Sequence, residues 1–200
     1  SGTCFAEWGH EVVCVDKDAQ KIAGLKRAIL PIYEPGLDEL VANHSAAGRL
    51  SFTCNLVEAL KGAAVVLIAV GTPARAGHGD ADPSFVYMAA RELAPHLEKG
   101  AVIVVKSTVP VGTGDVVEKI VGTIRPAGSF SVASNPEFLR EGAAIRDFLE
   151  PDRVVIGVED DHARKVLMGL YSPPLEARNT PIVVTRRRTS ELIKYAANAF

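Results

Sequence analysis

The stretch Ala63-Ala64-Val65-Val66-Leu67-Ile68-Ala69-Val70 carries no polar side chain, and neither does Val102-Ile103-Val104-Val105. An antiparallel strand with one face in water alternates apolar and polar residues, whereas a parallel strand covered by helices on both faces is apolar throughout. The two runs therefore predict buried parallel strands and set the fold class as α/β.

Shorter apolar runs alternate with amphipathic stretches around these two strands. The predicted strands span residues 11–15, 63–70, 101–106, 131–134, 153–158 and 181–185. The predicted helices span residues 18–27, 84–97, 115–124, 160–170 and 189–200, and several begin at an Asp or Ser that can cap free amides. This order predicts a doubly wound, mostly parallel Rossmann-like sheet with helices on both faces.

Composition and charge limit the class of partner. The hydrophobic content of 48% over 200 residues is enough to fill a large core, and the formal net charge is -2. Such a balance creates no field that would attract nucleic acid or an anionic membrane. No apolar run is long enough to cross a bilayer, so we expect a cytoplasmic protein without nucleic acid or membrane partners.

Motifs for metal binding and hydrolysis are missing from the sequence. The three cysteines, Cys4, Cys14 and Cys54, form no CxxC pair, and the five histidines form no HExxH motif. There is also no GxSxG and no GxxxxGK[ST]. We therefore expect no metal site, no hydrolase chemistry and no P-loop.

Both ends of the chain look interrupted. Residues 2–8 resemble the tail of a helix that ends at Gly9, and no strand precedes them. A Rossmann sheet places a first strand and a Gly-rich phosphate-binding turn at this point. The helical pattern from Thr189 to Phe200 ends without a stop signal. We expect these residues to be a segment of a longer protein.

Asp16 directly follows the predicted strand that ends at Val15. In a Rossmann domain an acid at this point accepts the ribose hydroxyls of NAD and repels the 2′-phosphate of NADP, although Lys17 and Lys21 would weaken that preference. The other interpretation is that Asp16 caps the following helix. Spacing alone favours neither.

Polar residues follow the two most apolar strands. Gly71, Thr72 and Pro73 come after the first, before a Gly-rich loop over residues 74–82, and Lys106-Ser107-Thr108 comes after the second. The carboxyl ends of parallel strands are where α/β sheets bind ligands. Ordinary turns, or a helix cap at Ser107 or Thr108, would produce a similar pattern.

The densest polar cluster is Asn135-Pro136-Glu137-Phe138-Leu139-Arg140-Glu141-Gly142. If this stretch is helical, Glu137 and Glu141 lie on one face, at a small electrostatic cost. The acids could serve a helix dipole, or they could line a site for a polyhydroxylated substrate together with Arg140. Further along, Lys194 and Asn198 are spaced to share a helix face, although such a pair is also common among exposed residues. The triplet Arg186-Arg187-Arg188 is typical of a solvated cluster of charges.

Six segments together resemble the UDP-glucose/GDP-mannose dehydrogenase family. They are residues 1–7, 31–37, 70–73, 106–112, 135–142 and 193–200, in the family's order. Residues 141–144 and 196–200 are more similar to the enzymes that act on UDP-glucose than to those that act on GDP-mannose. The resemblance implies NAD as cofactor and a two-step oxidation of the sugar C6 alcohol to a carboxylate.

The resemblance also implies a role for each candidate residue. Asp16, Lys21, Thr72, Thr108 and Glu141 match positions that contact NAD. Glu137, Phe138, Leu139, Arg140 and Glu141 match a substrate-binding segment, in which Glu137 assists proton transfer during thioester hydrolysis. Lys194 and Asn198 match catalytic groups that face the sugar. Residues 1–185 would form the NAD-binding domain, and residues 186–200 would begin a helix leading to a dimerisation and UDP-sugar-binding region of a homodimer or larger assembly.

The sequence departs from the family pattern in one respect. The family's nucleophilic cysteine lies in a Gly-Gly-Ser-Cys-Phe-Pro-Lys-Asp type of motif, which does not occur in these residues. We therefore expect these residues alone to be inactive. Two alternatives stay open: another NAD-linked nucleotide-sugar or hydroxyacid dehydrogenase, such as one acting on GDP-mannose, and a non-catalytic nucleotide-binding module.

Overall fold

The computed structural model describes residues 1–73, 81–176 and 178–199. It divides into two compact units, one made of Ser1–Ala59 with Leu139–Asp152 and the other of Leu60–Phe138 with Arg153–Phe200. The first is called unit 1 below and the second unit 2, and each is described by itself. Most of the loop predicted over residues 74–82 lies outside the described residues.

Unit 1 is built on a parallel pair of strands, β1 (Val12–Val15) and β2 (Leu50–Thr53), with Val12 opposite Leu50. Its helices are α1 (Gly2–Glu7), α2 (Ala19–Leu25), α3 (Leu37–Ala46), α4 (Leu56–Ala59) and α7 (Ala144–Leu149). Buried Ala6, Ile22, Val41, Leu50 and Phe52 form its core. Beside that core, the rings of Phe5 and Phe148 meet edge to face at 5.0 Å, which fixes α7 against α1.

Unit 2 contains a five-stranded sheet in the order β3-β4-β5-β6-β7. The strands are β3 (Val65–Ile68), β4 (Ala101–Val105), β5 (Phe130–Ser134), β6 (Val154–Gly157) and β7 (Ile182–Thr185). All neighbouring pairs are parallel except β5 and β6, which meet antiparallel at Ser134 and Gly157. Every residue of β4 is buried, as its apolar sequence predicts.

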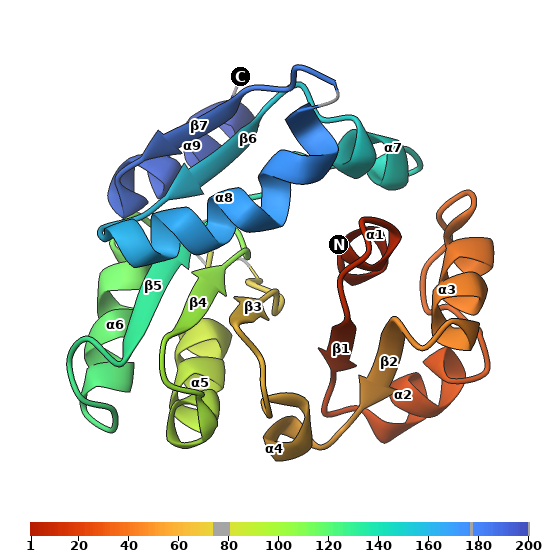
Figure 1. The fold of residues 1–200 in the computed structure, drawn as a ribbon, viewed down its shortest axis with the longest axis horizontal. Coiled ribbons are helices and arrows are strands. Elements are labelled where there is room, and N and C mark those ends of the chain that lie inside the picture. The colour runs from red at the N-terminus through yellow and green to blue at the C-terminus, as the bar shows by residue number, and fades with distance from the viewer. Residues whose placement is uncertain (74–80, 177, 200) are drawn as a thin grey trace. The chain divides into compact units, whose positions relative to one another are not determined.

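Helices cover both faces of this sheet. They are α5 (Ser84–Leu93), the short 3-10 helix η1 (Ala94–His96), α6 (Thr113–Gly122), α8 (Asp161–Glu176) and α9 (Arg187–Ala199). Figure 1 shows α8 in front of the strands and α9 behind them. The predicted doubly wound, mostly parallel α/β fold is confirmed.

Helices α3, α4 and α7 were not among the predicted helices, and three further local features differ from expectation. Strand β2 was not predicted, because only Leu50 and Phe52 of its four residues face the core. Helix α8 continues through Pro173 and Pro174, although prolines usually end a helix, because Tyr171 and Leu175 on the same turns are buried. Residues 135–140 are not helical, so the condition for placing Glu137 and Glu141 on one helix face is not met.

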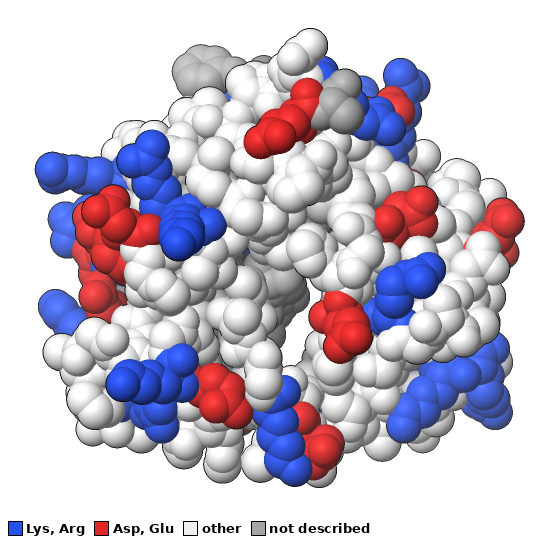
Figure 2. All heavy atoms as spheres, viewed as in Figure 1, with Lys and Arg blue, Asp and Glu red and all other residues white. Residues whose placement is uncertain are grey.

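The surface carries both signs of charge. On the face drawn in Figure 2, Lys and Arg side chains lie among Asp and Glu side chains over each unit, in keeping with the net charge of -2. Within residues 1–73, 81–176 and 178–199, no helix combines the length and the apolar character that crossing a membrane requires.

Candidate functional site

The loops that follow β3 and β4 are fastened to each other. The Thr72 hydroxyl donates to the Thr108 carbonyl at 2.8 Å, and the Ser107 hydroxyl donates to the Val70 carbonyl at 2.6 Å. A side chain added at Gly71 would meet no atom of the described residues within 4 Å, so among those residues nothing blocks a ligand from this backbone. The structure therefore brings together the two predicted cofactor contacts, Thr72 and Thr108, at the carboxyl ends of neighbouring parallel strands.

A buried polar network lies next to these loops. Lys106 is only 4% exposed, and its Nζ donates to Asn135 Oδ1 at 3.3 Å and lies 3.8 Å from Glu137 Oε2. Asn135 donates to the Val155 carbonyl at 2.8 Å and accepts from the Tyr171 hydroxyl at 2.5 Å. Burial, together with the charge of Glu137, raises the pKa of Tyr171, which keeps its hydroxyl a donor.

The terminal helix α9 brings a second cation near Glu137. Lys194 Nζ lies 5.1 Å from the centre of the Phe138 ring, and the Arg153 guanidinium lies 5.2 Å from that centre. Burial lowers the pKa of Lys194, while the charge of Glu137 raises it in part. Glu137, Phe138 and Lys194 thus come together in unit 2. Asn198 lies one turn further along α9 and is exposed.

Asp16 lies at the end of β1, where it was predicted, and it does not cap α2. The N-cap of that helix is Asp18, whose carboxylate accepts from the amides of Gln20 and Lys21. Asp16 instead accepts from the Asp18 amide at 3.0 Å and from Lys21 Nζ at 2.5 Å. The hydrogen bond from Lys21 lowers the pKa of Asp16, so its carboxylate is ionised near neutral pH. The capping interpretation of Asp16 was wrong.

Unit 1 also holds the rest of the predicted substrate segment, Leu139, Arg140 and Glu141. Glu34, which is only 9% exposed, accepts from the amides of Gly142 at 2.9 Å and Ala144 at 2.7 Å. This buried carboxylate fixes the loop that leads into α7 and leaves the Glu141 side chain exposed.

Arg140 anchors the same loop through Asp147 of α7. Its guanidinium donates to Asp147 Oδ2 at 2.9 Å and Oδ1 at 2.6 Å, and its amide donates to Oδ2 at 2.9 Å. These bonds lower the pKa of Asp147 to about 2. The Arg140 side chain is thus held in a fork by a carboxylate of its own unit.

The Asp147→Asn substitution should therefore destabilise the protein in a pH-dependent way. A lowered carboxyl pKa stabilises the fold above the unfolded value of about 4, and that contribution is lost as the pH falls towards about 2. The Tm difference between wild type and D147N should be constant near neutral pH and vanish in strong acid. Asp152→Asn, which removes a neighbouring charge without removing these bonds, should leave Tm nearly unchanged. A constant difference at all pH values would contradict the assignment.

The cross-linked strand ends of unit 2 and the strand-end acid of unit 1 are features of a nucleotide-binding α/β domain. Residues 1–175 match the NAD binding domain of the UDP-glucose/GDP-mannose dehydrogenase family. The chain belongs to that family, and NAD is the cofactor of the matched domain.

Relatives with assigned names agree with this family. The chain is 59% identical over 202 residues to the UDP-glucose 6-dehydrogenase of Rhizobium meliloti (strain 1021), covering all of the chain and 46% of that relative. A UDP-glucose dehydrogenase structure from Pyrobaculum islandicum superposes with a TM-score of 0.91 at 41% identity, covering 100% of the chain and 46% of that structure. The GDP-mannose dehydrogenase of Pseudomonas aeruginosa gives 0.90 at 33% identity, with 99% and 46% covered. The chain spans less than half the length of these relatives.

Sequence reasoning did not assign roles to several residues that build the site. The sequence pattern places Lys106 only in a polar strand end and Asn135 only in a polar segment. The signal for Lys106 was available, because it is a single charge directly after a fully apolar strand. Glu34 and Glu191 gave no such signal, since their partners are backbone amides far away in the sequence.

Proposed function

We propose that this chain is the NAD-binding part of an enzyme that oxidises C6 of UDP-glucose to the carboxylate in two steps. The observation that carries the proposal is the Glu137 carboxylate within 3.8 Å of buried Lys106 and within electrostatic reach of Lys194, next to the joined loops of Thr72 and Thr108. The name of the relative that is 59% identical supports the same substrate.

In this proposal five residues would contact NAD. Asp16 and Lys21 would bind the adenosine ribose, Thr72 and Thr108 would contact NAD at the strand ends, and Glu141 would lie near the nicotinamide. Bound NAD⁺ would supply the hydride acceptor for each oxidation. The partly exposed Asp16 carboxylate and the backbone at Gly71, which carries no side chain, suit these contacts. The proposed domain boundary places residues 1–185 in this NAD-binding domain and residues 186–200 at the start of a connecting helix.

The substrate would be bound by Glu137, Phe138, Leu139, Arg140, Glu141, Lys194 and Asn198. The ammonium of Lys194 stabilises negative charge that develops on the C6 oxygen, because a preorganised cation in a partly desolvated site acts more strongly than in water. Glu137, with Lys106 Nζ 3.8 Å from its carboxylate, would hold and return a proton during thioester hydrolysis. Arg140 contributes by shaping the loop through Asp147.

The nucleophile of the thioester step is not assigned to a cysteine of this chain. Burial raises the pKa of the Cys14 thiol, which disfavours the reactive thiolate. Cys4 is buried, and Cys54 is exposed next to β2 of unit 1. Catalysis in this proposal therefore uses the complete protein. A cytoplasmic location and a homodimer or larger assembly are part of the same proposal and rest on the sequence and the family resemblance.

The test is a turnover assay with the complete protein and NAD⁺. With UDP-glucose we expect two NADH per sugar consumed and a much lower kcat/KM with GDP-mannose. Equal rates on the two nucleotide sugars would overturn the substrate. Release of a single NADH per sugar would indicate an alcohol oxidation that stops at the aldehyde, as in an ordinary hydroxy-substrate dehydrogenase. Binding of both ligands without turnover would indicate a non-catalytic module.

The Asp16→Asn substitution should weaken NAD⁺ binding by about tenfold. The amide keeps the size of the side chain but removes the charged acceptor for the ribose hydroxyls, and hydrogen bonds to charged groups contribute about 1.5–3 kcal/mol. Discrimination against NADP⁺ should fall at the same time. Isothermal titration with both cofactors measures the two effects. Asp18→Asn, which keeps an acceptable helix cap, is the control, and an equal loss of NAD⁺ affinity in D18N would count against Asp16 as a ribose ligand.

A further inference from the structure

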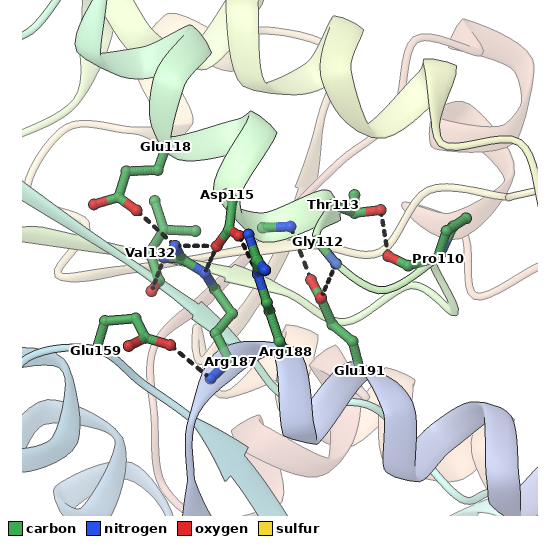
Figure 3. A network of polar contacts seen from close by, with 11 residues as sticks. Pro110, Gly112, Thr113, Asp115, Glu118, Val132, Glu159, Arg187, Arg188 and Glu191 are labelled. Atoms are coloured by element: carbon green, nitrogen blue, oxygen red, sulfur yellow. Dashed lines mark hydrogen bonds and ion pairs between the residues drawn. The ribbon is translucent and has the colours of Figure 1, made fainter.

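The helix that carries Lys194 is fixed to unit 2 by charged side chains of its first turns. Arg187 is 3% exposed, and its guanidinium donates to Asp115 at 2.6 Å, to Glu118 at 2.6 Å and to the Val132 carbonyl at 3.0 Å. Arg188 donates to the other oxygen of Asp115 at 2.5 Å. Burial raises the pKa of Asp115, but the bonds from Arg187 and Arg188 outweigh it and lower that pKa overall. These contacts join α9 to α6 and β5 (Figure 3).

Glu191 makes a different kind of contact from the same helix. Its carboxylate, 2% exposed, accepts from the Gly112 amide at 2.6 Å and from the Gly114 amide at 2.8 Å. Gly112 precedes α6 with a φ of 92°, in the left-handed region, and it has no side chain to cap the helix. As Figure 3 shows, Glu191 reaches these amides from α9 and so supplies the cap that the sequence of α6 lacks.

The residues before α6 form the loop that carries Thr108. At its start, Ser107 and Thr108 are bonded to the β3 loop through Val70 and Thr72. At its end, Thr113 donates from both its amide and its hydroxyl to the Pro110 carbonyl, and Glu191 holds Gly112. The loop between Ser107 and Gly112 is thus tied at one end to β3 and at the other to α9.

The packing leaves little room for α9 to shift against α6 and β6. A Cβ added at Gly114 would collide with the Arg187 side chain. A Cβ added at Gly157 of β6 would lie 2.5 Å from Ser190 Cβ and 2.8 Å from Arg187 Cα. Helix α9 therefore rests directly on the backbone of α6 and β6, and its position depends on both.

We propose that Glu191 is a positioning residue that fixes the Thr108 loop to helix α9. This bond keeps the cofactor contact of Thr108 and the sugar-facing Lys194 at a fixed distance from each other. Lys194 follows Glu191 by three residues and therefore lies close to the same helix face. A displacement of either element would change the distance between the two groups. The proposal rests on the proposed function for the roles of Thr108 and Lys194.

The test compares Glu191→Gln with Glu118→Gln in the complete protein. Gln keeps the size of Glu191 but turns an amide donor toward one of the two backbone amides. We expect E191Q to weaken NAD⁺ binding by about tenfold, to lower kcat, and to speed hydrogen exchange at the amides of residues 112–114 by about tenfold or more. E118Q removes a 52% exposed carboxylate that bonds the same Arg187 but no loop amide, so its NAD⁺ affinity should stay within about twofold of wild type.

A purely structural role predicts another result. E191Q would then lower Tm and the amount of folded protein, while the NAD⁺ Kd, the KM values and the exchange rates at residues 112–114 would match wild type. That result overturns the proposal. If E191Q does not fold, Gly114→Ala displaces Arg187 where α9 packs on α6, with the carboxylate intact, and should give the same loss of NAD⁺ affinity. If E191Q loses NAD⁺ affinity but the wild-type protein does not oxidise UDP-glucose, the positioning role of Glu191 is supported and the proposed function is refuted.

Discussion

Replacing Lys194 with alanine in the complete protein should lower kcat with UDP-glucose by about 100- to 1,000-fold, with a smaller change in KM. The ammonium lies 5.1 Å from the centre of the Phe138 ring, and burial lowers its pKa while the charge of Glu137 raises it in part. Under the proposed function, this cation would act on charge that exists only as the C6 oxygen reacts. Its removal therefore raises the barrier more than it weakens ground-state binding.

Steady-state kinetics with saturating NAD⁺ measure this effect. Lys119→Ala, on the exposed part of α6, removes a lysine of the same unit and should leave both parameters near wild type. Lys194→Arg keeps the charge but not its compact shape, and should recover only part of the rate. A rise in KM with an unchanged kcat would show that Lys194 binds the sugar in its ground state only.

Replacing Lys106 with methionine should separate activity from stability. The substitution removes a cation 3.8 Å from Glu137 Oε2 and 3.3 Å from Asn135 Oδ1, but Tyr171 still donates to that amide oxygen. Since a buried ammonium carries a large desolvation cost, Tm should stay the same or rise. Activity should fall by about 100-fold, because Glu137 loses both its position and its nearby positive charge.

The control for this substitution is Lys99→Met, at an exposed lysine just before β4. Circular dichroism on heating measures Tm, and NADH release measures turnover. A parallel loss of Tm and activity in K106M would mean that Lys106 supports the sheet and not the carboxylate. Retained activity would remove Lys106 from the site.

The parts of the fold that could be predicted are those whose signal is local. Continuous apolar runs identify β3 and β4 because burial on both faces leaves no polar position. Strand β2 gives a weaker signal, since two inward residues in four fit many conformations. Helix α8 passes two prolines because Tyr171 and Leu175 are buried, and that packing is a tertiary property.

For the site, too, local signals could be predicted from the sequence and tertiary contacts could not. Positions at strand ends, such as Asp16, Thr72 and Thr108, can be predicted because strand polarity places each of them at the carboxyl edge of its own sheet. Which of Asp16 and Asp18 caps α2 depends on backbone angles, and the sequence cannot choose between two acids two residues apart. The pairing of Lys106 with Asn135 and Glu137 depends on β4 lying beside β5, and this order is set by the whole sheet.

The crowding at Gly157 has a mechanical consequence for Lys194. Helix α9 touches the β6 backbone near Ser190, and at a rise of about 1.5 Å per residue the ammonium-bearing residue lies about 6 Å further along the axis. The position of Lys194 therefore depends on the close contact between α9 and the α-carbon of Gly157 on the neighbouring strand β6. A single methyl group added at Gly157 would displace the helix at Ser190 and so move Lys194, although no residue around Lys194 had changed.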